Sequence, residues 1–241
     1  MGLLVKDKQV VVPGDVLADD IGFIPGFGTY RNNHNLMCSR LGIVHIDGKV
    51  IKIIPLSGKY LPRRNDVVIG RVFDILMMGW RININSPYSA VLSSKETPDF
   101  IEKNDDLSKY FDLDDYLVCK VTNVTSQNLI DVTARDQGLR KLRGGRIIQV
   151  NTNKVPRIIG KKGSMVSMIK QATNSRIIVG QNGLIWIDGE PDKENFAVQA
   201  IRKIEAESHM PGLTDRMKTY LEELTGTKIV LNEGGDYNGL Q

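Results

Sequence analysis

The sequence predicts a multidomain protein that combines β and α+β folds: an N-terminal β-sandwich, a five-stranded barrel and a βααββα domain. Short apolar runs, separated by Gly, Pro, Asn and Asp, extend to about residue 143, as is typical of small β domains. Beyond that point the apolar spacing alternates between the periods of strands and helices. At 241 residues the chain also exceeds one average domain.

Residues 1–62 are expected to form the sandwich. The turn at 13–15 separates two valine-rich runs. Asp47 and Gly48 lie between two longer apolar runs, and an Asp-Gly pair between strands predicts a hairpin with a type I′ turn. The glycine-rich run at 26–30 has no helix after it, so we interpret it as a tight β corner or a protein contact rather than a nucleotide loop.

Residues 63–143 contain five predicted strands with a long insertion between the third and the fourth. The strands are expected at 67–76, 79–85, 88–92, 116–124 and 128–134. This arrangement predicts an OB-type barrel. The pattern Gly70-x-Val72, followed by Gly79 at the start of an alternating strand, resembles the S-one-type family of RNA-binding domains.

Alternation along the second of these strands separates core from surface. If Ile82 and Ile84 point into the barrel, Trp80 does so as well, whereas Arg81 and Asn83 point outward. Arg81 stands where the S-one-type family usually has an outward aromatic residue, and a guanidinium can also stack on a base. We therefore interpret Trp80 as core and Arg81 as an RNA contact.

Lys120 and Arg135 are further candidates for contact with an RNA backbone, although ordinary solvated positions explain them equally well. The histidine that the S-one-type family usually carries after the third strand is absent, because Ser93 and Ser94 stand there. The resemblance therefore implies a weaker stacking platform and leaves the base selectivity of the barrel open.

Residues 144–210 carry the motif Gly-Lys-Lys-Gly at 160–163, between an apolar run and an amphipathic segment. Pro156 suits the first turn of a short helix, Gly160 can end that helix with a positive φ, and Ser164 can cap the next one. The lysines and the N-terminus of the second helix supply positive charge and N–H groups. Both suit a phosphodiester backbone.

The flanking pattern completes a βααββα order. Strands are expected at 146–150, 176–179 and 184–187, and a helix at 192–207. This order and the GxxG loop resemble a KH domain, whose loop clamps about four nucleotides of a single strand. With this resemblance, the candidate RNA-binding residues are Arg157, Ile159, Gly160, Lys161, Lys162, Gly163, Ser164 and Arg176. The alternative is a solvated lysine turn between two core helices.

Charge is unevenly distributed along the chain, although the formal net charge is only +4. Residues 139–180 contain ten Lys or Arg and no acidic residue, whereas residues 96–115 contain eight Asp or Glu and two Lys. The basic block, which begins with a linker at 139–144, is an electrostatic footprint for a polyanion. The acidic block is expected to be a solvated loop.

The last segment, 211–241, is expected to add a helix at 215–224, followed by one strand at 228–231 and a frayed tail. Thr214 is the predicted cap of this helix, and Gly226 its end.

The remaining sequence signals are negative. Cys38 and Cys119 lack CxxC spacing, as expected for free thiols in a reducing compartment. The sequence shows no metal-ligand spacing, cofactor motif, membrane span or signal peptide. A cytoplasmic protein without cofactors or membrane contact is therefore expected.

Three motifs and the domain order together resemble a known family. The motifs are Val-Pro-Gly-Asp at 12–15, Gly-Phe-Gly-Thr-Tyr at 26–30 and Ile-Ile-Gly-Lys-Lys-Gly at 158–163. With a sandwich, an S-one-type barrel and one KH domain in that order, they resemble the archaeal exosome cap subunits, homologues of ribosomal RNA-processing protein four. The resemblance covers nearly the whole chain.

This resemblance implies a function. Three copies would sit on a hexameric ring of phosphorolytic exoribonuclease subunits and dock through the N-terminal domain. Their RNA-binding domains would feed the 3′ ends of single-stranded RNA into the ring for 3′-to-5′ degradation. The chain itself would not be an enzyme, and its residues agree, because they show no Ser-His-Asp arrangement, Walker loop or carboxylate cluster in a pocket-like context.

Two alternatives stay open at this stage. A transcription elongation factor of the NusA type also joins a barrel to KH units, but that family has two KH units in tandem, and one GxxG occurs here. Polynucleotide phosphorylase carries KH and S-one-type domains after large catalytic domains, whereas 62 residues precede the barrel here.

Overall fold

The computed structural model describes the chain apart from residues 1, 103–104, 209, 211 and 227–241. The strand predicted at 228–231 and the predicted tail therefore lie outside the described residues. The chain divides into two compact units, Met1–Gly58 and Lys59–Gln241.

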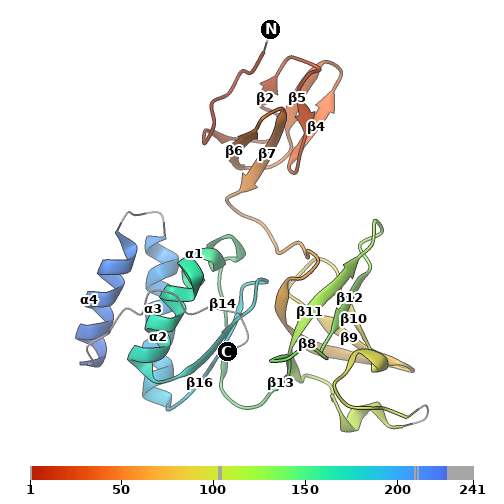
Figure 1. The fold of residues 1–241 in the computed structure, drawn as a ribbon, viewed down its shortest axis with the longest axis vertical. Coiled ribbons are helices and arrows are strands. Elements are labelled where there is room, and N and C mark those ends of the chain that lie inside the picture. The colour runs from red at the N-terminus through yellow and green to blue at the C-terminus, as the bar shows by residue number, and fades with distance from the viewer. Residues whose placement is uncertain (1, 103–104, 209, 211, 227–241) are drawn as a thin grey trace. The chain divides into compact units, whose positions relative to one another are not determined.

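The first unit is a sandwich of two small sheets, which confirms the predicted fold (Figure 1). The sheets have the orders β1-β6-β7-β3 and β2-β5-β4. Their strands are β1 (Val10–Val11), β2 (Val16–Ala18), β3 (Ile24–Pro25), β4 (Thr29–Asn32), β5 (Asn35–Cys38), β6 (Gly42–Asp47) and β7 (Val50–Pro55). A small apolar core that includes Leu17, Leu36 and Ile51 holds the unit together.

The predicted hairpin is present as β6 and β7, but its turn differs from the prediction. Asp47 pairs with Val50, so the two loop residues are Gly48 and Lys49. Gly48 has a φ of 58°, whereas Lys49 is not among the described residues with positive φ. A type I′ turn needs positive φ at both positions, and a glycine at the first position alone is the pattern of type II′.

The run at 26–30 forms a tight corner between β3 and β4, as predicted. Gly28 has a φ of 78°, and the Thr29 hydroxyl donates to the Gly26 carbonyl oxygen at 2.9 Å. A second hairpin, β4–β5, follows and was not predicted. Asn33 lies in its turn with a φ of 54°, and an asparagine that tolerates this conformation is the available sequence signal.

The second unit begins with the predicted five-stranded barrel. Its strands are β8 (Val67–Leu76), β9 (Gly79–Asn83), β10 (Ala90–Ser93), β11 (Tyr116–Val124) and β12 (Ile130–Thr133). β10 and β12 pair in parallel, and β11 pairs with both β8 and β12, which closes the barrel. Tyr60 also lies in the barrel core, so the barrel unit starts before the boundary predicted at residue 63.

The prediction for Trp80 is confirmed. Its side chain is fully buried in the barrel, as are those of Ile82 and Ile84, whereas Arg81 is exposed. The Trp80 Nε1–H donates to the Phe111 carbonyl oxygen at 2.8 Å, and the two rings meet edge to face with centroids 5.2 Å apart. The register that alternation predicts for β9 is therefore correct.

The acidic block at 96–115 is not simply a solvated loop, which corrects the prediction. The 3₁₀ helix η1 (Ser94–Glu96) ends at the first residue of the block, and the block contains the 3₁₀ helix η2 (Leu107–Lys109). Leu107 and Phe111 are buried in the barrel core. Net charge does not indicate that the block packs on the barrel, because a few apolar residues among many carboxylates are enough to attach the segment.

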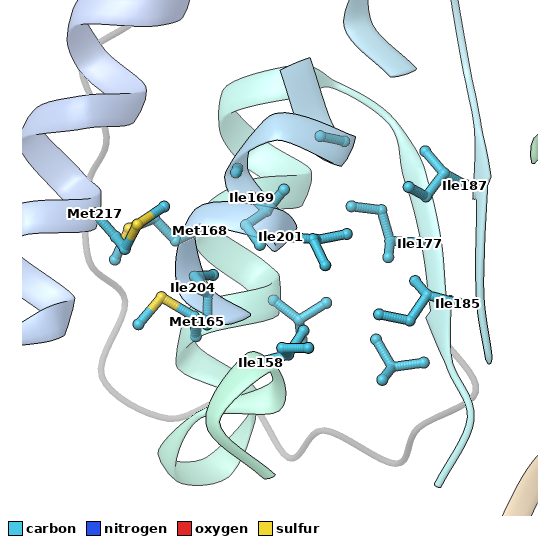
Figure 2. Packing of buried hydrophobic residues seen from close by; sticks show 14 of the residues in the cluster. Ile158, Met165, Met168, Ile169, Ile177, Ile185, Ile187, Ile201, Ile204 and Met217 are labelled. Atoms are coloured by element: carbon cyan, nitrogen blue, oxygen red, sulfur yellow. The ribbon is translucent and has the colours of Figure 1, made fainter. Parts of the chain in front are cut away.

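The KH-like part consists of β14 (Arg146–Gln149), α1 (Val155–Ile159), α2 (Ser164–Thr173), β15 (Arg176–Val179), β16 (Leu184–Asp188) and α3 (Pro191–Glu207). The predicted βααββα order is confirmed. The sheet order is β14-β16-β15, and the helices cover one face of the sheet (Figure 1). In Figure 2 the strand residues Ile177, Ile185 and Ile187 point toward Ile169 and Ile201 of the helices.

Both predicted hydroxyl caps are wrong. Helix α2 begins at Ser164 with Gly163 as its N-cap, and helix α4 (Leu213–Thr225) begins with Gly212 as its N-cap. Both glycines are left-handed, with φ of 79° and 68°, so the chain turns into each helix one or two residues earlier than a Ser or Thr cap would allow. Gly226 ends α4 as predicted.

Helix α4 belongs to the KH core. Its Met217 and Leu221 are fully buried in the same cluster as α2 and α3, and Figure 2 shows Met217 beside Met168 of α2. The predicted separate C-terminal helix is therefore part of this fold.

The other face of the KH sheet packs on the barrel. Alternate strand residues form one apolar cluster with residues of the barrel and of the segment after it. The cluster comprises Ile147, Ile178, Leu184 and Trp186 of the sheet with Ile69, Val118, Leu139 and Leu142. The sheet is thus covered on both faces within this unit.

The predicted basic linker at 139–144 needs a correction. Lys141–Leu142 form a short strand, β13, beside β11. Leu139 and Leu142 are buried in the cluster between barrel and KH sheet. The two leucines attach this basic segment to the fold, so it is not a free connection.

Candidate nucleic-acid interface

The Gly-Lys-Lys-Gly loop joins α1 and α2 in the way the sequence predicts. Lys161 and Lys162 are exposed, and no salt bridge in the described part of the chain involves either lysine. Lys162 itself lies in the left-handed region, with φ of 51° and ψ of 32°. The loop therefore presents two ammonium groups to solvent at the N-terminus of a ten-residue helix.

Gly160 is required by the loop geometry. Its φ is 78°, and its N–H donates to the Pro156 carbonyl oxygen at 3.0 Å, which ends α1. A Cβ at this position would lie 2.7 Å from the Met165 Cβ and 2.8 Å from the Met165 backbone nitrogen. Any larger residue would therefore push the loop away from α2.

The candidates next to the loop fall into two groups. Arg157 is exposed on α1, close to the two lysines in sequence. Ile159 and Ser164 are half-buried, and Ile159 packs against the KH core. Arg157 could contact a bound strand directly, whereas Ile159 chiefly fixes the position of the loop.

Arg176 is not brought to the loop. It begins β15, after the C-terminal end of α2, whereas the loop precedes the N-terminal end of that helix. A ten-residue helix is roughly 15 Å long. Arg176 lies 3.7 Å from the Asp188 carboxylate. An RNA contact by Arg176 stays a prediction, and it would involve a different part of a bound strand.

A further cation lies on α2. Burial, and next the positive charge of Arg140, lower the pKa of Lys170. Arg140 comes from the segment that joins the barrel to the KH sheet, so positive side chains from the two parts approach each other here. Arg140 and Lys170 were predicted only as members of the basic block.

The barrel candidates are split between two places. Arg81 is on the outer face of β9, where its guanidinium lies 3.8 Å from the Asp74 carboxylate. Lys120 and Arg135, by contrast, line one pocket together with Arg64. Arg64 was predicted only as part of a turn. Nothing in the turn pattern indicates that Arg64 lies near Lys120 and Arg135, which are more than 50 residues away in sequence.

The turn between β15 and β16 also escaped prediction as a functional feature. The Asn182 side chain is fully buried. Its amide donates to the carbonyl oxygens of Ile69 and Ile84 at 2.7 and 2.9 Å and accepts from the Ile69 N–H at 3.3 Å. These bonds attach the KH part to the barrel, so the interface candidates of both belong to one compact unit.

Among the described residues, no group of three or more His, Cys, Asp or Glu side chains is arranged to hold a metal ion. No helix in the described ranges is long and apolar enough to cross a membrane. Cys38 and Cys119 are free and buried.

Fold and loop together define a KH-domain protein with an adjoining OB-type barrel. The family model of the KH domain matches residues 145–193. A second family model, described as the N-terminal region of the exosome complex exonuclease RRP4, matches residues 10–47.

Curated relatives extend this similarity over most of the chain. The chain is 43% identical to the exosome complex component Rrp4 of Methanobrevibacter smithii over 91% of this chain and 72% of the relative. It is also 43% identical to that of Picrophilus torridus, over 91% of this chain and 94% of the relative. The chain therefore belongs to the Rrp4 family of exosome components.

A solved structure agrees. A crystal structure assigned to an exosome complex RNA-binding protein superposes with a TM-score of 0.63 at 34% identity. The match covers 69% of this chain and 97% of that one.

Proposed function

We propose that this chain is a non-catalytic RNA-binding subunit that caps the phosphorolytic ring of an exosome. It binds single-stranded RNA with its KH domain and barrel and directs 3′ ends into the ring for 3′-to-5′ degradation. The observation that carries the proposal is the exposed Lys161–Lys162 pair at the N-terminus of α2, in a chain of the Rrp4 family.

The loop supports RNA binding on physical grounds. Two lysines and the first N–H groups of α2 can neutralise adjacent phosphates, and the flanking glycines let a strand approach the backbone closely. Neutralising phosphates releases counterions, so binding should weaken steeply with salt. These contacts read the backbone and give little base selectivity.

The N-terminal sandwich supports docking on other chains. Several large apolar side chains are exposed on it, including Ile24, Phe27, Tyr30 and Ile54. Strand β4 lies at the edge of its three-stranded sheet, and an edge strand can pair with another chain. A ring subunit is the proposed partner, with three copies of this chain on each ring.

The test is co-elution with reconstituted ring subunits. The full chain should co-elute with the ring, give the native mass of three copies per ring and speed degradation of a labelled single-stranded RNA. A shortened chain beginning at Lys59, which keeps Tyr60 in the barrel core, should bind RNA but not the ring. Circular dichroism would verify that it is folded.

Three results would contradict the proposal. Ring binding by the shortened chain would remove the docking role of the sandwich. Absence of ring binding by the full chain would leave a single-stranded RNA-binding protein outside an exosome. Phosphate-dependent RNA degradation by the pure chain alone would contradict the non-catalytic assignment.

A further inference from the structure

A polar pocket of about 390 Å³ lies on the side of the barrel where β11 and β12 pair. Three basic side chains line it, Arg64, Lys120 and Arg135. Two carboxylates, those of Glu96 and Asp136, line it as well. Arg64 is more than 50 positions from the other two in sequence, whereas Lys120 and Arg135 lie on and just after the paired strands β11 and β12. The fold therefore brings Arg64 to a place where two basic residues already lie.

Backbone bonds fix the segment that carries Arg64. The Asn65 N–H donates to the Val121 carbonyl oxygen at 2.8 Å, and the Val121 N–H donates to the Asp66 carbonyl oxygen at 2.9 Å. The turn is thereby attached to β11, next to Lys120. Arg64 is thus held at the pocket by the barrel itself.

The other two cations are also held in place. Lys120 is the register partner of Thr133 across β11 and β12, and its ammonium lies 2.9 Å from the Asp136 carboxylate. The Arg135 N–H donates to the Thr133 hydroxyl at 3.2 Å, and its Nη1 donates to the Lys95 carbonyl oxygen at 3.4 Å. These bonds pre-position the charges before any ligand arrives.

The charge balance favours an anion. Asp136 offsets the charge of Lys120, which leaves two guanidinium groups, of Arg64 and Arg135, and one further carboxylate, of Glu96, at the pocket. Guanidinium groups match the oxygens of a phosphate in a bidentate manner. The two guanidinium groups repel each other, and a phosphate bound between them would attract both and offset that repulsion.

We propose that this pocket binds a phosphate group of the RNA strand and forms an anchoring point on the barrel that is separate from the KH loop. The proposal rests on the proposed function and extends it, because it adds Arg64 and unites it with Lys120 and Arg135 in one site. Its polar lining suits the sugar-phosphate backbone, so the contact is expected for any sequence.

The experiment measures binding of a labelled single-stranded oligoribonucleotide at several salt concentrations, with the full chain. The pocket variant is Arg64→Gln with Arg135→Gln. The matched control is Arg71→Gln with Lys109→Gln, which removes two cations outside the pocket, each paired with an Asp. The pocket variant should flatten the slope of log K against log salt by roughly 0.7, the value for one phosphate contact with a single strand. The control should keep the slope of the unmodified chain.

Single variants and small ligands complete the test. Arg64 is exposed on a turn, so Arg64→Gln alone should fold normally and flatten the slope by less than the double variant does, because Arg135 remains to contact the phosphate. Melting curves compare the folding of all variants. Calorimetry with inorganic phosphate and adenosine monophosphate separates a site for free phosphate from a site for RNA.

The outcomes are distinguishable. If the pocket variants and the control bind RNA equally well with equal slopes, the pocket does not hold the strand, although the proposed function stands. If the pocket variants lose binding of free phosphate but keep RNA binding, the site serves a small anion and the inference is wrong. If the unmodified chain does not bind RNA at all, the proposed function itself fails.

Discussion

Asn182 and Ile69, 113 positions apart in the sequence, exchange two hydrogen bonds through the Asn182 side chain and the Ile69 backbone. The Asn182 amide also donates to the Ile84 carbonyl oxygen, and the Gln181 N–H donates to the Val67 carbonyl oxygen at 2.8 Å. The turn between β15 and β16 thus supplies hydrogen-bond partners to backbone groups of Val67, Ile69 and Ile84 in the barrel, which would otherwise need water. It fixes the KH loop and the barrel pocket within one body.

Replacing Asn182 with Ala should destabilise this unit. Each buried backbone group left without a partner costs about 1–3 kcal/mol, so a loss of at least about 2 kcal/mol is expected in urea unfolding. The control is Gln181→Ala, which keeps the backbone bond of the same turn and should change stability little. Equal stability of both variants would show that the Asn182 bonds do not hold the two parts together.

Reversing the charge of the loop should weaken RNA binding without unfolding the protein. In the double variant Lys161→Asp with Lys162→Asp, two exposed cations are lost. The slope of log K against log salt should fall by roughly 1.4, at about 0.7 per contact for a single strand. Fluorescence anisotropy at four or more salt concentrations measures it. An unchanged affinity with an unchanged slope would exclude this loop as a phosphate clamp.

Substitutions at two neighbouring residues of the second barrel strand should affect stability and RNA binding separately. Trp80→Ala removes a fully buried ring and should cost roughly 3–5 kcal/mol of stability. Arg81→Ala removes an exposed side chain whose pair with Asp74 is at the surface, so melting should change little while RNA affinity falls. Thermal melting and anisotropy on both variants provide the comparison. An Arg81→Ala variant with unaltered RNA affinity would remove this residue from the interface.

The buried thiol of Cys119 should make stability depend on alkaline pH. Burial raises the pKa of Cys119 to about 12, against about 8.5 for a cysteine in an unfolded chain. Between these values the unfolded chain releases a proton that the folded chain retains. The contribution of this thiol to the free energy of unfolding is therefore fully present below about pH 8.5. It is lost as the pH rises toward 12, by up to about 1.4 kcal/mol per pH unit.

Urea unfolding between pH 8 and 10 measures this effect, with Cys119→Ala as the reference that removes the thiol but keeps the other titrating groups. The unmodified chain should lose more stability over this range than the variant. Alkylation of Cys119 at pH 8 should also be negligible until the barrel unfolds. Rapid alkylation of the native protein would contradict the burial of this thiol.

Local patterns were sufficient for much of this fold. Alternation placed Trp80 in the core and Arg81 outside because side chains of a strand alternate strictly between two faces. Gly160 marked the end of α1 because few other residues accept its φ. The acidic block was wrongly predicted to be only a solvated loop, since net charge does not reveal that Phe111 anchors the segment in the barrel.

The sequence by itself therefore determined the domain order, the core-facing side chains of β9 and the Gly-Lys-Lys-Gly loop, because these depend on residues near one another in the chain. Tertiary structure decided that Asn182 bonds to Ile69, that Leu139 and Leu142 cover the second face of the KH sheet, and that Arg64 meets Lys120 and Arg135 at one pocket. Each of these contacts joins segments whose sequences carry no common period or motif. Their meeting depends on how the sheets twist and close, which is a property of the whole packed unit.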